Sequence, residues 1–160
     1  IKMDTFTGLC KDYLKKDINH YVKLVLKRDT KGIDKEIAFQ WLKDHIEGCK
    51  MYESHNPSFT AHNNGVYSLL KGENFEAIKY HKSSLMIDER SGSFRGIQME
   101  LYVLKKLYSL IGDEENTEFF SNRLNDSIVS NGMYFNENDH DITFNYALSV
   151  VNLEVNVEDD

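Results

Sequence analysis

The sequence contains few of the residues that break or cross-link a chain. It has one proline, nine glycines and two cysteines in 160 residues. So few turn-forming residues argue against a sandwich of many short strands and favour long helices. The cysteines, Cys10 and Cys49, fall on apolar faces of predicted helices, so we interpret them as small core residues rather than a disulfide or metal pair. This pattern favours a reducing compartment, and we expect a cytoplasmic protein.

Long apolar runs and positive charge are also scarce. The sequence has no run of 18 apolar residues, so we predict no membrane-spanning helix. Its net charge is −7, and residues 111–160 hold one of the 19 basic residues but 12 of the 26 acidic ones. Such a C-terminal part repels nucleic acid and anionic lipid. We therefore expect neither a nucleic acid nor a membrane as partner.

Apolar residues recur at helical spacing along most of the chain, which predicts seven amphipathic helices. The first, over residues 5–29, has Leu9, Tyr13 and Val25 on its apolar face, and the second carries Trp41 and Leu42. The ranges that we expect are 5–29, 34–53, 58–71, 74–90, 94–111, 114–130 and 142–153. The fold class that follows is all-α.

A short sequence motif occurs twice. "YSLLKGEN" starts at Tyr67 and "YSLIGDEEN" at Tyr108, with Gly72 and Gly112 placed 40 residues apart. Each copy ends one predicted helix, and each glycine supplies the positive φ that lets the chain reverse. The Asp, Glu and Asn that follow suit the N-terminus of the returning helix. A helical hairpin that cannot bury its own apolar face is typical of repeat proteins.

The stretch "NNGVYSLLKGENFEAIKYHKSSLMID", residues 63–88, resembles a tetratricopeptide repeat. Gly65 matches the small residue of the first helix, Gly72 the turn, and Ala77 the small residue where the two helices cross. The continuation "MIDERSGSFRG" is similar to the longer repeat variety of LGN-type scaffolds and of the peptide-sensing Rap and PlcR regulators. The second copy departs from the pattern, with Lys105 and Thr117 in place of the small residues.

The resemblance implies an α-α superhelix of about three stacked antiparallel helix pairs plus a C-terminal capping helix. We expect one domain over 1–160, made of an N-terminal pair (1–55), two tetratricopeptide-like pairs (58–130), and a loop, capping helix and acidic tail (131–160). Another α-α solenoid or an irregular helical bundle is the alternative.

No motif of the sequence indicates catalysis, and we expect neither an enzyme nor a cofactor. GxSxG, GxGxxG, HExxH and the phosphate-binding loop are all absent. His45 and Cys49 share a helix face, but nothing supplies an orienting acid. His62 and His81 could face each other across a helix pair and bind zinc. Because no acidic ligand lies one helical turn from His62, a partly buried, hydrogen-bonded histidine is the preferred interpretation, with no metal.

In the family, first helices line a concave groove that holds a peptide or a partner's helix. Carried over by position, the resemblance assigns to this groove Phe59, His62, Asn63, Val66, Met99, Tyr102, Lys106 and Ser109. The Asn63 amide suits both the N–H and C=O of an extended backbone, and Lys106 suits a carboxylate. We therefore expect a non-catalytic interaction scaffold with a protein or peptide partner. The alternatives are a sensory fragment of a multidomain regulator that responds to a signal peptide, and residues that merely pack against a neighbouring repeat.

Overall fold

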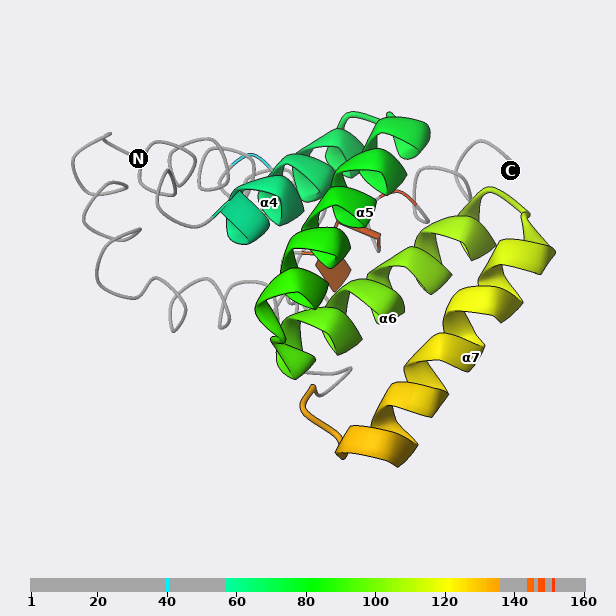
Figure 1. Ribbon diagram of the computed structural model, residues 1–160. Helices are drawn as coiled ribbons and strands as arrows, with labels where there is room; N and C mark the ends of the chain where they lie inside the picture. Colours follow the sequence, from blue (N-terminus) through cyan, green and yellow to red (C-terminus); the bar gives the residue numbers. More distant parts are fainter. Residues whose placement is uncertain (1–39, 41–56, 136–143, 146, 149–150, 152–160) are drawn as a thin grey trace, which may run out of the picture. The chain divides into compact units, whose positions relative to one another are not determined.

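The computed structural model describes residues 40, 57–135, 144–145, 147–148 and 151. These residues contain four α-helices and no strand, which confirms the all-α class for the described part of the chain (Figure 1). The helices are α4 (Pro57–Leu70), α5 (Asn74–Ser91), α6 (Phe94–Leu110) and α7 (Glu114–Asn131). None of these helices has the length and apolarity to cross a membrane.

The predicted helices of residues 58–130 are confirmed, and each begins and ends within one residue of the range expected from the sequence. The predicted helices in 5–29 and 34–53 lie outside the described residues, apart from Gln40, which is helical. The expected capping helix over 142–153 is described at residues 144–145, 147–148 and 151, which are also helical.

Three turns between the helices are made in the same way. Gly72, Gly92 and Gly112 have φ values of +80°, +71° and +78°, where a side chain would be strained. The N–H of the residue after each glycine donates to a carbonyl five residues earlier, from Glu73 to Ser68, from Ser93 to Asp88 and from Asp113 to Tyr108, at 2.9–3.0 Å. This is the Schellman motif, which satisfies the last carbonyls of a helix and reverses the chain.

The turns lead directly into capped helices. The Ser93 hydroxyl accepts from the Gly96 N–H at the start of α6, and the Asp113 carboxylate accepts from the Asn116 N–H at the start of α7. Pro57 opens α4, where its missing N–H would have had no partner in any case. Of the polar residues that the sequence analysis marked after Gly72 and Gly112, Asp113 therefore caps α7, whereas Glu73 before α5 makes no side-chain cap bond.

Consecutive helices pack against one another, α4 on α5, α5 on α6 and α6 on α7. Figure 1 shows α4 with α5 and α6 with α7 as two hairpins. Apolar side chains from all four helices fill the interfaces, and the most deeply buried belong to Val66, Leu69, Ala77, Leu101, Val103, Leu104 and Leu107.

The two hairpins repeat with a period of 40 residues, set by their turns. Gly112 follows Gly72, and Gly132 follows Gly92, after 40 residues, and all four have positive φ. The carbonyls that accept the equivalent turn bonds belong to Ser68 and Tyr108, so Tyr108 is the structural equivalent of Ser68 and not of Tyr67. The repeated letters "YSL" are therefore offset by one position from the structural repeat: Tyr108 is buried and stacks on Phe120, whereas the Tyr67 ring lies 4.5 Å from the Lys71 amine.

The chain packs as two compact units, one of residues 56–141 and one of residues 1–55 with 142–160. The border after residue 55 coincides with the predicted end of the N-terminal pair. All four helices belong to the first unit. In the second unit, Phe144, Ala147 and Val151 are buried and have the spacing of one helix face.

Candidate functional site

The eight residues predicted to line a groove divide into two groups. Phe59 and Ser109 are exposed, and Met99 and Lys106 are partly exposed. His62, Asn63, Val66 and Tyr102 are buried. Asn63, which we expected to be accessible to a ligand backbone, is only 6% exposed. A peptide at the predicted groove could therefore contact the exposed and partly exposed residues directly, but not the four buried ones.

The segment of the chain that follows α7 lies against α6. After α7 ends, residues 132–135 have no regular secondary structure. The Gln98 side chain on α6 donates from its amide nitrogen to the Gly132 carbonyl at 2.7 Å. Its amide oxygen accepts from the Tyr134 N–H at 2.8 Å. One buried side-chain amide thus holds both a donor and an acceptor of the backbone of this segment.

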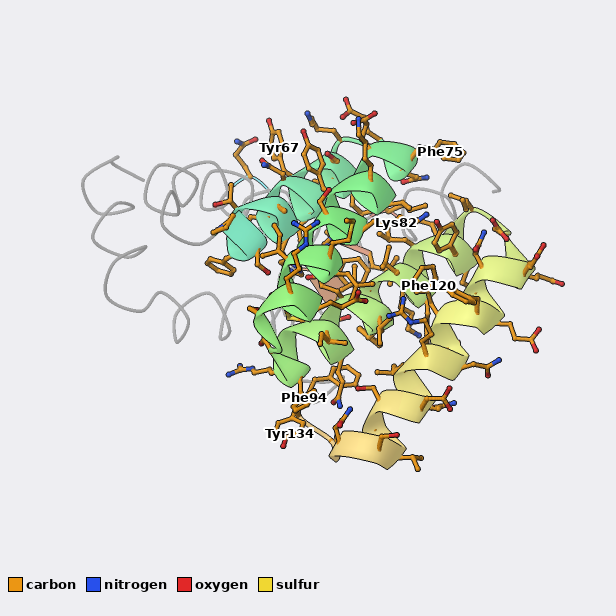
Figure 2. All side chains as sticks on the ribbon, viewed as in Figure 1. Tyr67, Phe75, Lys82, Phe94, Phe120 and Tyr134 are labelled. Atoms are coloured by element: carbon orange, nitrogen blue, oxygen red, sulfur yellow. The ribbon has the colours of Figure 1, made fainter. Side chains whose placement is uncertain are left out.

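Two aromatic contacts flank this amide, one helical turn to either side. The Phe94 and Tyr134 rings lie with centroids 5.6 Å apart (Figure 2), and those of Tyr102 and Phe135 5.4 Å apart. Phe94, Gln98 and Tyr102 are four residues apart, so they share one side of α6, which we name the α6 face. At its centre the α6 face bonds to the backbone of segment 132–135, and at both ends it contacts side chains of that segment.

The sequence analysis found only Tyr102 of this face. We had expected residues 131–141 to be a loop, and nothing in a loop's composition tells which helix it will contact. The available signal was the spacing of Phe94, Gln98 and Tyr102 on one helix, opposite the aromatic pair that follows Gly132.

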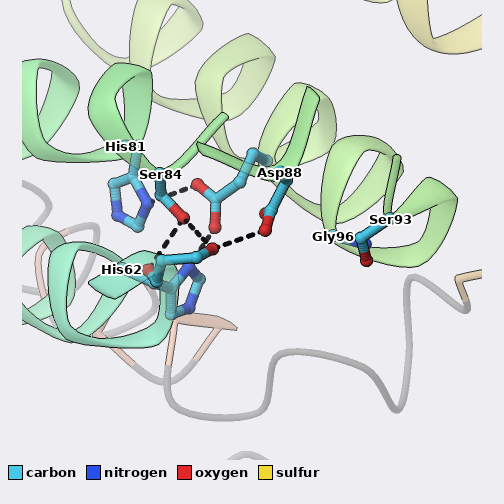
Figure 3. A network of polar contacts seen from close by, with 8 residues as sticks. His62, His81, Ser84, Asp88, Ser93 and Gly96 are labelled. Carbon is cyan, nitrogen blue, oxygen red and sulfur yellow. Dashed lines mark hydrogen bonds and ion pairs between the residues drawn. The ribbon is translucent and has the colours of Figure 1, made fainter. Parts of the chain in front are cut away.

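A second cluster lies where α4, α5 and α6 meet. His62 comes from α4, His81 from α5 and Glu100 from α6, and all three are buried (Figure 3). The Nδ1 atom of His81 lies 2.8 Å from one oxygen of the Glu100 carboxylate, and Nδ1 of His62 bonds to the other oxygen. The two imidazole rings meet edge to face with centroids 4.8 Å apart. We name these three residues the His–Glu–His cluster.

The two imidazoles keep the carboxylate ionised in spite of its burial. Burial acts to raise the pKa of Glu100, but the charges of His62 and His81 and their hydrogen bonds outweigh it and lower the pKa to about 2. Within the described residues, the ion pairs of Glu100 are with these two rings. A buried carboxylate of this kind is stable only while its partners remain beside it.

Gly65 makes room for the cluster. A Cβ atom on Gly65 would lie 2.4–2.9 Å from three atoms of the His81 ring, closer than any normal contact. The ring therefore lies directly on the backbone of α4. The position 40 residues later carries Lys105, and the position 40 residues after His81 carries Ser121. In the second hairpin, the small residue is therefore Ser121 on α7 and the large one is Lys105 on α6, the reverse of Gly65 and His81 in the first hairpin. This exchange accounts for the departure of Lys105 from the tetratricopeptide pattern.

A hydroxyl–carboxylate network continues from the cluster toward the ends of the helices (Figure 3). Ser58 donates to Asp88 at 2.6 Å, and Ser84 donates to the Ser58 carbonyl at 2.9 Å. Asp88 lies so close to Gly96 that a Cβ there would come within 2.4 Å of its carboxylate. Burial raises the pKa of Asp88, in spite of the hydrogen bond from Ser58.

The sequence indicated partly buried, hydrogen-bonded histidines. Both rings are hydrogen-bonded but buried, and their partner Glu100 was missed. No acidic residue lies one helical turn from His62, whereas Glu100 is 38 residues away on another helix. Two of the other residues considered for chemistry, His45 and Cys49, lie outside the described part of the chain.

Comparison with family models, with curated proteins and with solved structures gives no match for this chain. Its function is therefore inferred from its own residues.

Proposed function

We propose that this chain is a non-catalytic interaction module of the tetratricopeptide type, an α-α superhelix of about three helix pairs that holds an extended peptide of a partner protein. First helices α4 and α6 supply the binding side. The observation that carries the proposal is the pairing of Gln98 with both the carbonyl of Gly132 and the N–H of Tyr134.

The repeat supports the superhelical part of the proposal. Two hairpins with the same turn geometry and a 40-residue period stack through α5 and α6. Repeating units that stack in this way form extended surfaces made from equivalent helices. Phe59 on α4 and Met99 on α6 are such equivalents, and both keep part of their side chain at the surface.

The α6 face supports the peptide part. Recognition of an extended chain commonly uses main-chain hydrogen bonds for affinity and side-chain contacts for specificity. Segment 132–135 makes both kinds of contact with the α6 face. We infer that this segment occupies the position of a ligand and that a partner peptide with aromatic residues displaces it. Lys106, whose amine lies 5.6 Å from the Tyr102 ring, is placed to receive an acidic group of that peptide.

The test uses the full chain with Tyr134→Ala and Phe135→Ala combined, which removes the aromatic anchors of the internal segment. A fluorescent peptide of sequence NGMYFNE, residues 131–137, is then titrated and followed by anisotropy. We expect the double variant to bind the peptide at least about tenfold more tightly than the unchanged chain, because a tethered segment competes at millimolar effective concentration.

Adding Gln98→Ala to the double variant should weaken the peptide by about five- to a hundredfold, the effect of one buried hydrogen-bonding group. Lys79→Ala, an exposed change on α5, is the matched control and should leave binding unchanged. The proposal would be contradicted if the folded double variant did not bind the peptide. It would also be contradicted if Gln98→Ala and Lys79→Ala lowered the affinity for the peptide equally. The sensory alternative uses the same groove and meets the same test.

A further inference from the structure

We propose that the His–Glu–His cluster is a binding site for a divalent first-row transition metal, with Zn²⁺ as the preferred ion. The site is independent of the peptide-binding function. It would join α4, α5 and α6 through one ligand from each helix.

The donor atoms already converge. One ring nitrogen of His62, one of His81 and one carboxylate oxygen of Glu100 all lie within 4.8 Å of one another. Zinc binds imidazole nitrogen and carboxylate oxygen at about 2.0–2.2 Å, which sets tetrahedral donors about 3.3 Å apart. To reach this spacing, the His81–Glu100 contact of 2.8 Å has to open by about half an ångström, and the widest separation, up to 4.8 Å, has to close by about 1.5 Å.

The donor chemistry selects the class of ion. Two imidazoles and one carboxylate suit zinc and other first-row transition metals, whereas calcium and magnesium prefer oxygen donors alone. The absence of an acidic ligand near His62 in sequence was the reason to prefer a metal-free histidine. Glu100, brought in from α6, supplies that ligand and removes the objection.

Charge and burial indicate a structural site. Glu100 and His81 are fully buried, and His62 is nearly so. In the metal-free cluster the two imidazoles stabilise the carboxylate, and a divalent cation bound to one nitrogen of each ring would take over that role. Because His81 and Glu100 are both inaccessible to solvent, a substrate has no route to the ion. The metal would therefore fix the junction of three helices and not take part in a reaction.

The experiment titrates the chelator-treated full chain with ZnCl₂ in competition with a chromophoric chelator. We expect one ion per chain from this cluster. His81→Gln and Glu100→Gln, each checked for folding by circular dichroism, should weaken binding at least about tenfold, because even residues that only support metal ligands cost that much when changed. Glu118→Gln, an exposed carboxylate on α7, is the matched control and should bind zinc as the unchanged chain does.

A second measurement covers the case in which the ligand variants fail to fold. The chain has six histidines, and replacing His20, His45, His55 and His140 by Gln leaves only His62 and His81. X-ray absorption of the zinc-loaded four-histidine variant should show two imidazole nitrogens and a carboxylate oxygen. The proposal would be overturned if the spectra of this variant and of the unchanged chain showed no imidazole ligand. It would also be overturned if removal of the other four histidines abolished zinc binding, or if His81→Gln and Glu100→Gln left the zinc affinity unchanged.

Discussion

At the residue scale, the helix junction depends on how closely side chains approach a neighbouring backbone. The His81 ring occupies the space of the missing Cβ of Gly65, and the Asp88 carboxylate does the same at Gly96. A glycine inside a helix ordinarily weakens it by about 1 kcal/mol relative to alanine. Two such glycines are therefore explained by the polar groups that pack against them.

Gly65→Ala should destabilise the protein although alanine is the better helix former. The added methyl group collides with His81 and displaces it from Glu100, which we expect to outweigh the gain in helix propensity and to cost about 1–2 kcal/mol net. Urea unfolding followed by circular dichroism measures the change. In a His81→Ala background the same substitution should become neutral or stabilising. An equal loss in both backgrounds would show that the collision with His81 is not the cause.

Asp88→Asn should change how stability depends on pH. Because burial raises the folded pKa of Asp88 above its unfolded value, this group favours folding while protonated and loses that contribution as pH rises through the folded pKa. The amide still offers an oxygen to the Ser58 hydroxyl but does not ionise. The variant should therefore gain stability relative to the unchanged chain as pH rises from the unfolded pKa of about 3.9 through the folded pKa.

Any pH-independent effect of the amide shifts every point equally, so the difference between the two unfolding curves isolates Asp88. Urea unfolding at several pH values in that range gives the result. A constant difference, or one that shrinks as pH rises, would contradict the assigned direction of the pKa shift.

Residues that act through distant partners were the hardest to predict. The sequence shows that His62 and His81 can face each other, because one hairpin determines their separation. It does not show Glu100, whose approach depends on how α6 stacks on α5. Asn63 illustrates the reverse error, since a position that faces a groove in the family is buried in this chain.

At the element scale, the helices are set by local signals that can be read directly. Glycines at the C-termini, acceptors at the N-termini and apolar periodicity all act within a few residues, so the bounds of α4 to α7 follow from the sequence to within one residue. Contacts such as that between Gln98 and segment 132–135 join residues 34 and 36 apart and have no local signal.

Ala77 and Glu76 are neighbours on α5 that should respond differently to the same substitution. Ala77 is fully buried and Glu76 is exposed. Helix axes approach to about 8–10 Å at such small residues, so Ala77→Leu should cost about 1–3 kcal/mol, whereas Glu76→Leu should stay within about 0.5 kcal/mol. Thermal unfolding of both variants decides the matter. An unchanged melting temperature for Ala77→Leu would mean that the helix crossing is assigned to the wrong residue.

At the scale of the whole molecule, residues 56–141 form a compact unit with both hairpins, the α6 face and the His–Glu–His cluster. Expressed alone, this segment should be strongly helical by circular dichroism and unfold in one cooperative transition, as single domains of this size do. A broad, non-cooperative melt, or a strand content near the fifth that is typical of globular domains, would contradict this expectation.

The 40-residue spacing of the turn glycines defines the unit by which the helical repeat can be extended. A helix rotates by about 100° per residue, so one residue inserted within α6 would turn the side chains that follow it in that helix away from their partners. A second copy of residues 73–112 placed after Gly112 restores the same phase at both junctions.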